Sequence, residues 1–146
     1  MLKESTVTYT FLISIKDIID IKKIITEKIE SLTNKNFNEK YGFLKSIKKI
    51  LDFDIKKCSN NNFKSELLIT VSFIGLFLYI EKNNIINCRI TDINNITIGN
   101  YQNIKIMIID DNTKNLKVGD NVDVKILATQ IKLNHNYINA VATLNF

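Results

Sequence analysis

The stretch Leu67–Ile80 constrains the fold more than any other part of the chain. It is almost continuously apolar and rich in β-branched and aromatic side chains. That pattern is typical of a strand buried on both faces, or of two strands in succession. The run is too short to cross a bilayer as a helix, so we expect no membrane association. Glu81–Asn84 ends it and a new alternating segment starts at Ile85. We therefore expect two modules joined by one strand, residues 1–80 and 81–146.

Residues 1–80 predict a β-α-β-β unit. The apolar side chains of Ile18–Leu32 recur every three or four positions, as in an amphipathic helix whose isoleucines cover a sheet, and Asp17 is the expected N-cap. Gly42 stands near the start of a strand, as a bend or as a close approach to a partner's backbone. The expected elements are strand Val7–Ile15, helix Ile18–Leu32, strand Phe37–Phe53, loop Ile55–Asn62 and strand Ser65–Ile80.

Residues 81–146 predict a small barrel. Short strands at near-regular spacing, separated by Asn- and Gly-containing turns such as Gly99–Asn100 and Val118–Asn121, are typical of an OB-fold. The expected strands are Ile85–Ile93, Ile96–Ile98, Tyr101–Ile109, Asn121–Ile131 and Tyr137–Leu144. The predicted fold class is therefore α+β, a β-α-β-β amino-terminal domain followed by a five-stranded OB barrel.

The positive charge is concentrated in the amino-terminal part. The net charge is +5, and residues 1–64 carry 13 lysines against 8 acidic residues, whereas residues 65–146 are neutral. This asymmetry indicates an acidic partner, either nucleic acid or an acidic protein surface, with a solvated lysine-rich face as the alternative. The amino terminus has no signal-peptide pattern, and Cys58 and Cys88 are more typical of free thiols than of a disulfide. We expect an intracellular protein.

Catalytic patterns are missing from the sequence. The lone His135 has no adjacent nucleophile, and the glycines are scattered singly, so neither a triad nor a phosphate-binding loop is predicted. One histidine and two separated cysteines do not make a zinc site. Asp110–Asp111 could bind a metal, but such a pair between two strands is more often a solvated turn. We expect no enzymatic activity, no metal and no cofactor.

The order of elements resembles the stalk subunit of multisubunit DNA-dependent RNA polymerases, which is the seventh subunit of eukaryotic polymerase II and its archaeal counterpart. In that family a strand and a helix precede a K-[FY]-G-[FY] segment, here Lys40–Phe43. A long strand, here Glu66–Asp92, then leads into an OB barrel that ends in V-x-V-K-I and x-A-x-G-T/S strands. These match Val122–Ile126 and Asn139–Thr143, although the last glycine is replaced here.

The resemblance implies a non-catalytic transcription subunit that docks on core polymerase subunits and offers its barrel to nascent RNA. It also implies a second stalk subunit as partner, with Phe73–Tyr79 as its seat. The implied host is a nuclear, cytoplasmic or viral-factory polymerase, such as one of a large DNA virus with an AT-rich genome. Docking residues implied at the amino-terminal end are Ser14, Lys16, Asp17, Tyr41, Gly42, Lys56, Lys57 and Asn61.

The barrel residues expected to reach nucleic acid are cationic or aromatic, since lysine and arginine attract phosphates and tyrosine rings stack on bases. They are Arg89, Tyr101, Lys105, Lys125, Lys132, His135 and Tyr137. A neutral barrel predicts weak RNA binding. The alternatives are a free-standing OB protein that binds single-stranded nucleic acid, and a purely structural assembly protein.

Overall fold

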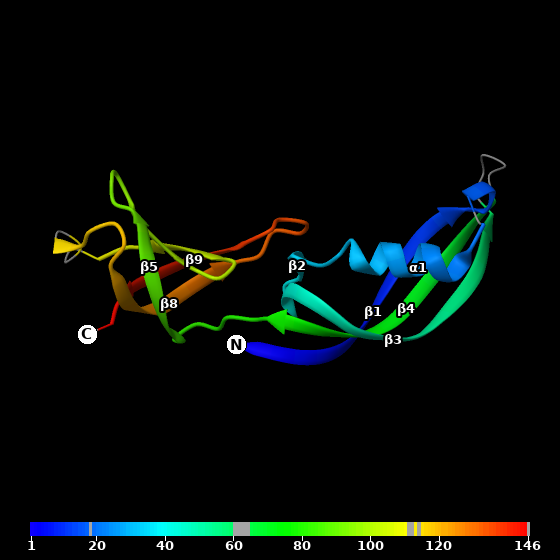
Figure 1. The fold of residues 1–146 in the computed structure, drawn as a ribbon, viewed down its shortest axis with the longest axis horizontal. Coiled ribbons are helices and arrows are strands. Elements are labelled where there is room, and N and C mark those ends of the chain that lie inside the picture. The colour runs from blue at the N-terminus through cyan, green and yellow to red at the C-terminus, as the bar shows by residue number, and fades with distance from the viewer. Residues whose placement is uncertain (18, 60–64, 111–112, 114, 146) are drawn as a thin grey trace. The chain divides into compact units, whose positions relative to one another are not determined.

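The computed structural model describes residues 1–17, 19–59, 65–110, 113 and 115–145, and shows a mostly β protein with one short helix (Figure 1). The elements are β1 (Leu2–Ser14), η1 (Ile15–Asp17), α1 (Ile21–Glu30), β2 (Lys35–Asn38), β3 (Gly42–Ser59), β4 (Ser65–Leu78), β5 (Ile85–Asp92), β6 (Thr97–Tyr101), β7 (Ile104–Ile108), β8 (Asn121–Gln130) and β9 (Ile138–Leu144).

The chain forms two compact units that do not follow a single cut in the sequence. The sheet unit comprises residues 2–34 and 44–77, and the barrel unit comprises Met1, residues 35–43 and residues 78–146. Residues 35–43 therefore pack with the barrel. The division into docking and barrel domains at 1–80 and 81–146 stays a prediction about function.

The amino-terminal strands form a four-stranded sheet in the order β1-β4-β3-β2. The central strand β4 buries alternate side chains, among them Ile69, Val71 and Phe73, while the residues between them are only half-buried. The run that begins at Leu67 is thus one strand with a single fully buried face. Phe73 and Phe77 are buried within the chain, so their side chains are not on a surface that a partner could bind.

Helix α1 packs on this sheet through the predicted isoleucine stripe, with Ile25 and Ile29 buried. The ammonium of Lys28 lies 5.9 Å from the ring centroid of Phe11 on β1. The predicted N-cap Asp17 is wrong. Asp17 ends the 3-10 segment η1, and Asp20, in extended conformation, caps α1 by accepting from the backbone N–H of Lys23 at 3.2 Å.

The strand predicted over Phe37–Phe53 is two strands, because the chain turns back between Asn38 and Gly42. The Tyr41 backbone N–H donates to Asn38 Oδ1 at 2.8 Å, and Gly42 has a φ of +88°. A Cβ at Gly42 would collide with the carbonyl oxygen of Leu78, so the glycine allows a close approach within this chain. The predicted loop Ile55–Asn62 is wrong over Ile55–Ser59, where β3 continues, and residues 60–62 lie outside the described part of the chain.

The carboxy-terminal strands form a closed barrel in the order β5-β6-β7-β9-β8, compatible with an OB-like barrel. Strands β5 and β8 close it, and β7 and β9 run parallel while the other pairs are antiparallel. Alternation places Ile104, Ile106 and Ile108 of β7 in the core, which also includes Phe43 and Leu78. The predicted five-stranded barrel is confirmed. The boundary between its second and third strands is wrong, because β6 continues to Tyr101, which was predicted to start the next strand.

One predicted barrel turn is wrong. Gly99 lies inside β6 opposite Ile106, and the chain turns at Gln102–Asn103, where Gln102 adopts a φ of +49°. A Cβ at Gly99 would lie 2.6 Å from Cys88 Sγ, so this glycine makes room for a buried side chain. The predicted turn at Val118–Asn121 is confirmed: Gly119 has a φ of +97°, and its N–H donates to the Ile90 carbonyl at 2.8 Å.

Candidate nucleic-acid interface

A groove of about 310 Å³ lies at one end of the barrel, between the β6–β7 turn and the loop 131–137 that joins β8 to β9. We call it the barrel groove. It brings together two of the predicted residues, Lys105 and Tyr137, on a surface otherwise made mostly of side-chain amides. Its lining is Asn100, Gln102, Asn103, Ile104, Lys105, Asn136 and Tyr137.

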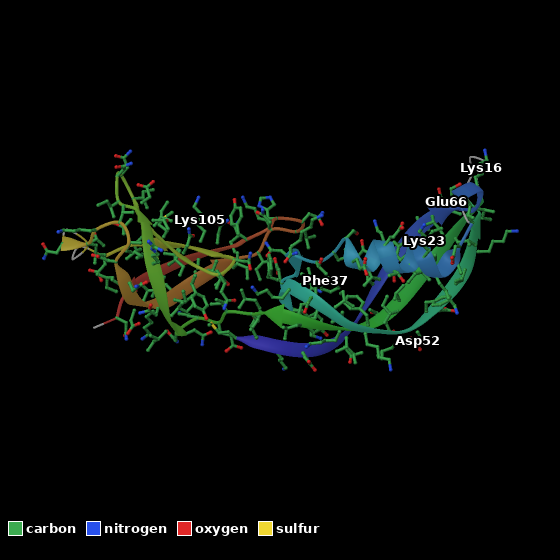
Figure 2. All side chains as sticks on the ribbon, viewed as in Figure 1. Lys16, Lys23, Phe37, Asp52, Glu66 and Lys105 are labelled. Carbon is green, nitrogen blue, oxygen red and sulfur yellow. The ribbon has the colours of Figure 1, made fainter. Side chains whose placement is uncertain are left out.

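The register of the barrel strands extends this surface sideways from the groove. Arg89 on β5 lies opposite Asn100 on β6, and Asn100 lies opposite Lys105 on β7. Cross-strand partners project on the same face of a sheet, with strands about 4.8 Å apart. Arg89, Asn100 and Lys105 therefore form one outward row, with two cations separated by an amide. Arg89 and Lys105 are exposed (Figure 2 labels Lys105).

The loop 131–137 is fixed by a residue of β2. Asn36 is 3% exposed, and its side-chain amide donates to the carbonyl oxygens of Lys132 and Tyr137 at 2.8 and 2.9 Å. Its backbone N–H donates to the His135 carbonyl at 2.7 Å. Three bonds from one residue thus hold the loop that carries Lys132, His135 and Tyr137.

Not all predicted nucleic-acid residues reach the groove. Tyr101 is partly buried against the barrel core, and its hydroxyl accepts from Gln102 Nε2 at 3.3 Å. The ring centroids of His135 and Tyr137 are 5.8 Å apart, which places the histidine beside the groove. Lys125 lies opposite Ile85 and Thr143, whereas Lys105 lies opposite Asn139, so the two lysines belong to different rows.

Sequence reasoning missed the amides. Asn36, Asn100, Gln102 and Asn136 were assigned no binding role, although asparagines such as Asn100 were placed in turns. An amide both donates and accepts hydrogen bonds, as base edges do. The barrel groove therefore combines one cation, several amides and one aromatic ring, a set that can hold a phosphate and contact a base.

The predicted docking residues fall in both units. Ser14, Lys16, Lys56 and Lys57 belong to the sheet unit, where the ends of β1 and β3 lie at the end of the sheet at which β4 begins (Figure 1). Figure 2 shows Lys16 and Glu66 at that end. Lys16, Lys56 and Lys57 are exposed.

The other docking predictions have different surroundings. The side chain of Asp17 and the whole of Asn61 lie outside what the structure describes. Tyr41 and Gly42 belong to the barrel unit, in the β2–β3 hairpin. The Tyr41 ring contacts Phe37 with centroids 6.4 Å apart, and the Lys40 ammonium lies 5.2 Å from the Tyr41 centroid.

Among the described residues, no group of three or more His, Cys, Asp or Glu side chains is arranged to hold a metal ion. Asp110 accepts from the Leu144 backbone N–H at 3.2 Å. Cys88 carries a free, buried thiol; burial raises its pKa above the ordinary value of 9.0, the nearby Asp123 carboxylate adds to the rise, and a backbone hydrogen bond opposes it. Within the described ranges, no helix is long and apolar enough to cross a membrane.

Compared with known protein families and with curated proteins, the chain matches no family model and no curated sequence.

Proposed function

We propose that the chain is a non-catalytic subunit of a DNA-dependent RNA polymerase, which docks on the core enzyme through its amino-terminal region and turns its barrel toward the emerging RNA. The observation that carries this proposal is the row Arg89–Asn100–Lys105 beside the barrel groove, on a barrel that follows a helix-covered sheet. This order of a sheet, one helix and a closed barrel is the order of the stalk subunits that the sequence resembles.

The chemistry of the barrel favours weak contact with RNA rather than tight capture. The row supplies two cations, and the groove supplies one tyrosine ring as a stacking surface. Each neutralised phosphate contributes about 0.7 to the salt dependence of single-strand binding, so two give a log–log slope of about −1.4. A weak site becomes useful when a tether raises the local RNA concentration to about the millimolar range. Attachment to the polymerase provides such a tether.

The amino-terminal region supplies the charge for docking. Residues 1–64 carry the whole net charge of +5, and Lys16, Lys56 and Lys57 are exposed in the sheet unit. Exposed lysines favour an acidic surface on the core enzyme. Ser14, Asp17, Asn61 and Tyr41 complete the proposed docking set, whereas Gly42 is buried against Leu78 of this chain and is left out. A second stalk subunit is the proposed companion.

Affinity purification of the tagged chain from the cell or virion that produces it tests the proposal. We expect the large catalytic polymerase subunits to copurify in stoichiometric amounts and to survive nuclease treatment. A matched control is the variant with glutamate at Lys16, Lys56 and Lys57, which should lose the polymerase while its barrel stays folded. Recovery of the chain without polymerase subunits would overturn the proposal.

A second candidate function, a free-standing protein that binds single-stranded nucleic acid, is favoured by the barrel groove itself. A free binder needs submicromolar affinity without a tether, and that affinity falls steeply with salt. Titration of the isolated chain with a fluorescent single-stranded RNA over a range of salt concentrations separates the two. A docking protein should bind weakly, with a log–log salt slope of about −1.4 or shallower. A slope of about −3 or steeper would favour the free binder.

A further inference from the structure

A second groove lies in the sheet unit, where helix α1 meets strand β3. It has a volume of about 530 Å³, and we call it the edge groove. Its lining is Lys22, Ile25, Thr26, Ile50, Leu51, Asp52 and Phe53. Four consecutive residues of one strand line it. Since successive side chains of a strand point to opposite faces, a groove that touches all four runs along the strand's edge.

Among the described residues, no strand lies beside that edge over most of its length. In the described sheet, β3 pairs with β4 on one side and with β2 on the other. Strand β2 has only four residues and is joined to β3 by a tight turn. Just before β2, the Asn34 backbone N–H donates to the Leu44 carbonyl of β3. Beyond strand pairing, no backbone hydrogen bond of the described residues involves residues 46–57. The outer backbone groups of this segment therefore face the groove or solvent.

The side chains along this edge are unusually apolar for an exposed strand. Leu51, Phe53 and Ile55 are 45, 38 and 39% exposed, and they alternate with Asp52 and Asp54. An open edge with exposed, alternating apolar side chains is a ready template for another strand. The same features in a functional protein mark a site of β-strand addition, where main-chain bonds give affinity and alternate side chains give specificity.

The charge along the edge identifies the kind of strand that fits. Residues 45–57 carry five lysines and two aspartates, a net charge of +3. One of these lysines, Lys48, already forms an ion pair with Glu4 at 3.7 Å. Two copies of the chain pairing edge to edge would bring these lysines together, which opposes self-association. A single-stranded nucleic acid would meet the lysines but could not pair with alternating backbone N–H and C=O groups. An acidic, extended polypeptide satisfies both the charge and the backbone.

We propose that the edge groove binds an extended acidic segment of a partner protein, which adds a strand to β3 with its apolar side chains against Leu51 and Phe53. The opposite edge strand, β1, serves as an internal reference. Lys56 and Lys57 belong both to this edge and to the proposed docking set. Binding of the acidic strand itself requires neither RNA nor a polymerase, so it can be tested separately from the proposed transcription role.

The test is an NMR titration of the full ¹⁵N-labelled chain with a capped peptide of about seven residues, the length of a common strand, that alternates Val or Ile with Glu or Asp. We expect chemical-shift changes at the amides of residues 46–57 and of α1. The matched control peptide has the same sequence with alternate amides N-methylated, which removes backbone pairing but keeps charge and hydrophobicity. It should bind at least about tenfold more weakly.

Substitutions test where the peptide binds. Phe53→Glu and Leu51→Glu each put a carboxylate into the edge groove. Each should lower the affinity for the peptide at least about tenfold, the size of a hot-spot loss. Leu12→Glu, at an exposed leucine of β1, should leave binding unchanged. Each variant is checked for an unchanged barrel spectrum, and the N-methylated peptide tests the idea without any variant.

Four results would overturn the proposal. They are no shift with either peptide at millimolar concentration, equal binding of both peptides, dimerisation of the peptide-free chain through β3, and tighter binding of a single-stranded RNA than of the acidic peptide at this edge.

Discussion

The barrel closes on itself, whereas the amino-terminal sheet leaves strand edges open. In the barrel every strand has two neighbours, so its backbone groups are paired and only side chains and loops can meet a ligand. Within the described part of the sheet, β1 has one strand neighbour, and β3 lacks one along most of its outer side. The barrel is therefore suited to contact through side chains, and the sheet to contact through backbone.

The two regions also differ in the charge they offer. The row and groove of the barrel combine two cations with neutral amides, whereas the β3 edge carries five lysines between residues 45 and 57. In the two proposals, the more basic surface takes a peptide and the less basic one takes RNA. An exposed edge adds a demand for hydrogen bonds that a peptide meets and a nucleic acid does not.

The largest expected effect concerns Gly42, which joins the β2–β3 hairpin to the barrel core. Gly42→Ala should lower the free energy of unfolding by about 3 kcal/mol, because it adds a strained positive φ to a backbone collision with Leu78. Urea unfolding followed by circular dichroism measures the loss. The matched control is Gly119→Ala, where φ is also positive but a Cβ would have only Arg89 Nη2 at 3.9 Å nearby. It should cost about 1 kcal/mol. Equal losses would show that the hairpin does not pack against Leu78.

The next effect concerns the hydrogen bonds from Asn36 to loop 131–137. Asn36→Ala removes two side-chain hydrogen bonds and should destabilise the barrel unit by about 2 kcal/mol. Amide exchange of loop residues such as His135 should become faster. Asn38→Ala, which removes the single bond to the Tyr41 N–H, should cost about half as much and leave the loop protected. Unchanged exchange in Asn36→Ala would contradict the assigned role.

A smaller effect is expected on RNA affinity. Lys105→Ala should lower the affinity for single-stranded RNA about fivefold at low salt. It should also make the log–log salt slope shallower by about 0.7. Lys125→Ala removes the same charge from a different row and should change affinity less than about twofold. Fluorescence anisotropy measures both variants. Equal losses would mean that RNA follows overall charge and not the barrel groove.

The smallest effect concerns the buried thiol of Cys88. Because its pKa is raised in the folded state, the unfolded state loses its proton first as the pH rises. The thiol's contribution to stability is therefore fully present below pH 9.0 and declines above it. Cys88→Ala should show a flatter loss of stability than the parent chain in urea unfolding between neutral pH and pH 10. Parallel curves would contradict a raised pKa.

The sequence was most informative where a pattern repeats every two residues. Ile104, Ile106 and Ile108 alternate with Lys105 and Met107, so the strand and its inward face could be read directly. The isoleucine stripe of α1 was equally readable. Single positions that fit two roles gave wrong predictions. Gly99 is a typical turn residue but lies inside a strand and makes room for Cys88. Asp17 was predicted as the helix N-cap, whereas Asp20 is the N-cap in the structure.

The candidate site was harder to predict than the fold. Lys105 and Tyr137 could be named by residue type, but their meeting in one groove depends on the parallel pairing of β7 and β9. Asn36 could not be found, because its side-chain partners lie 96 and 101 residues away in the sequence. The edge groove depends on β2 being short, and the sequence predicted one strand where the structure has two.

Site-resolved crosslinking of the chain inside the purified polymerase assembly tests the central claim most directly. Protein crosslinks of Lys16, Lys56 and Lys57 should reach the large polymerase subunits, while ultraviolet crosslinks to nascent RNA should map to the barrel-groove segments 100–105 and 136–137. RNA crosslinks confined to residues 45–57, or an assembly without any polymerase subunit, would contradict the account.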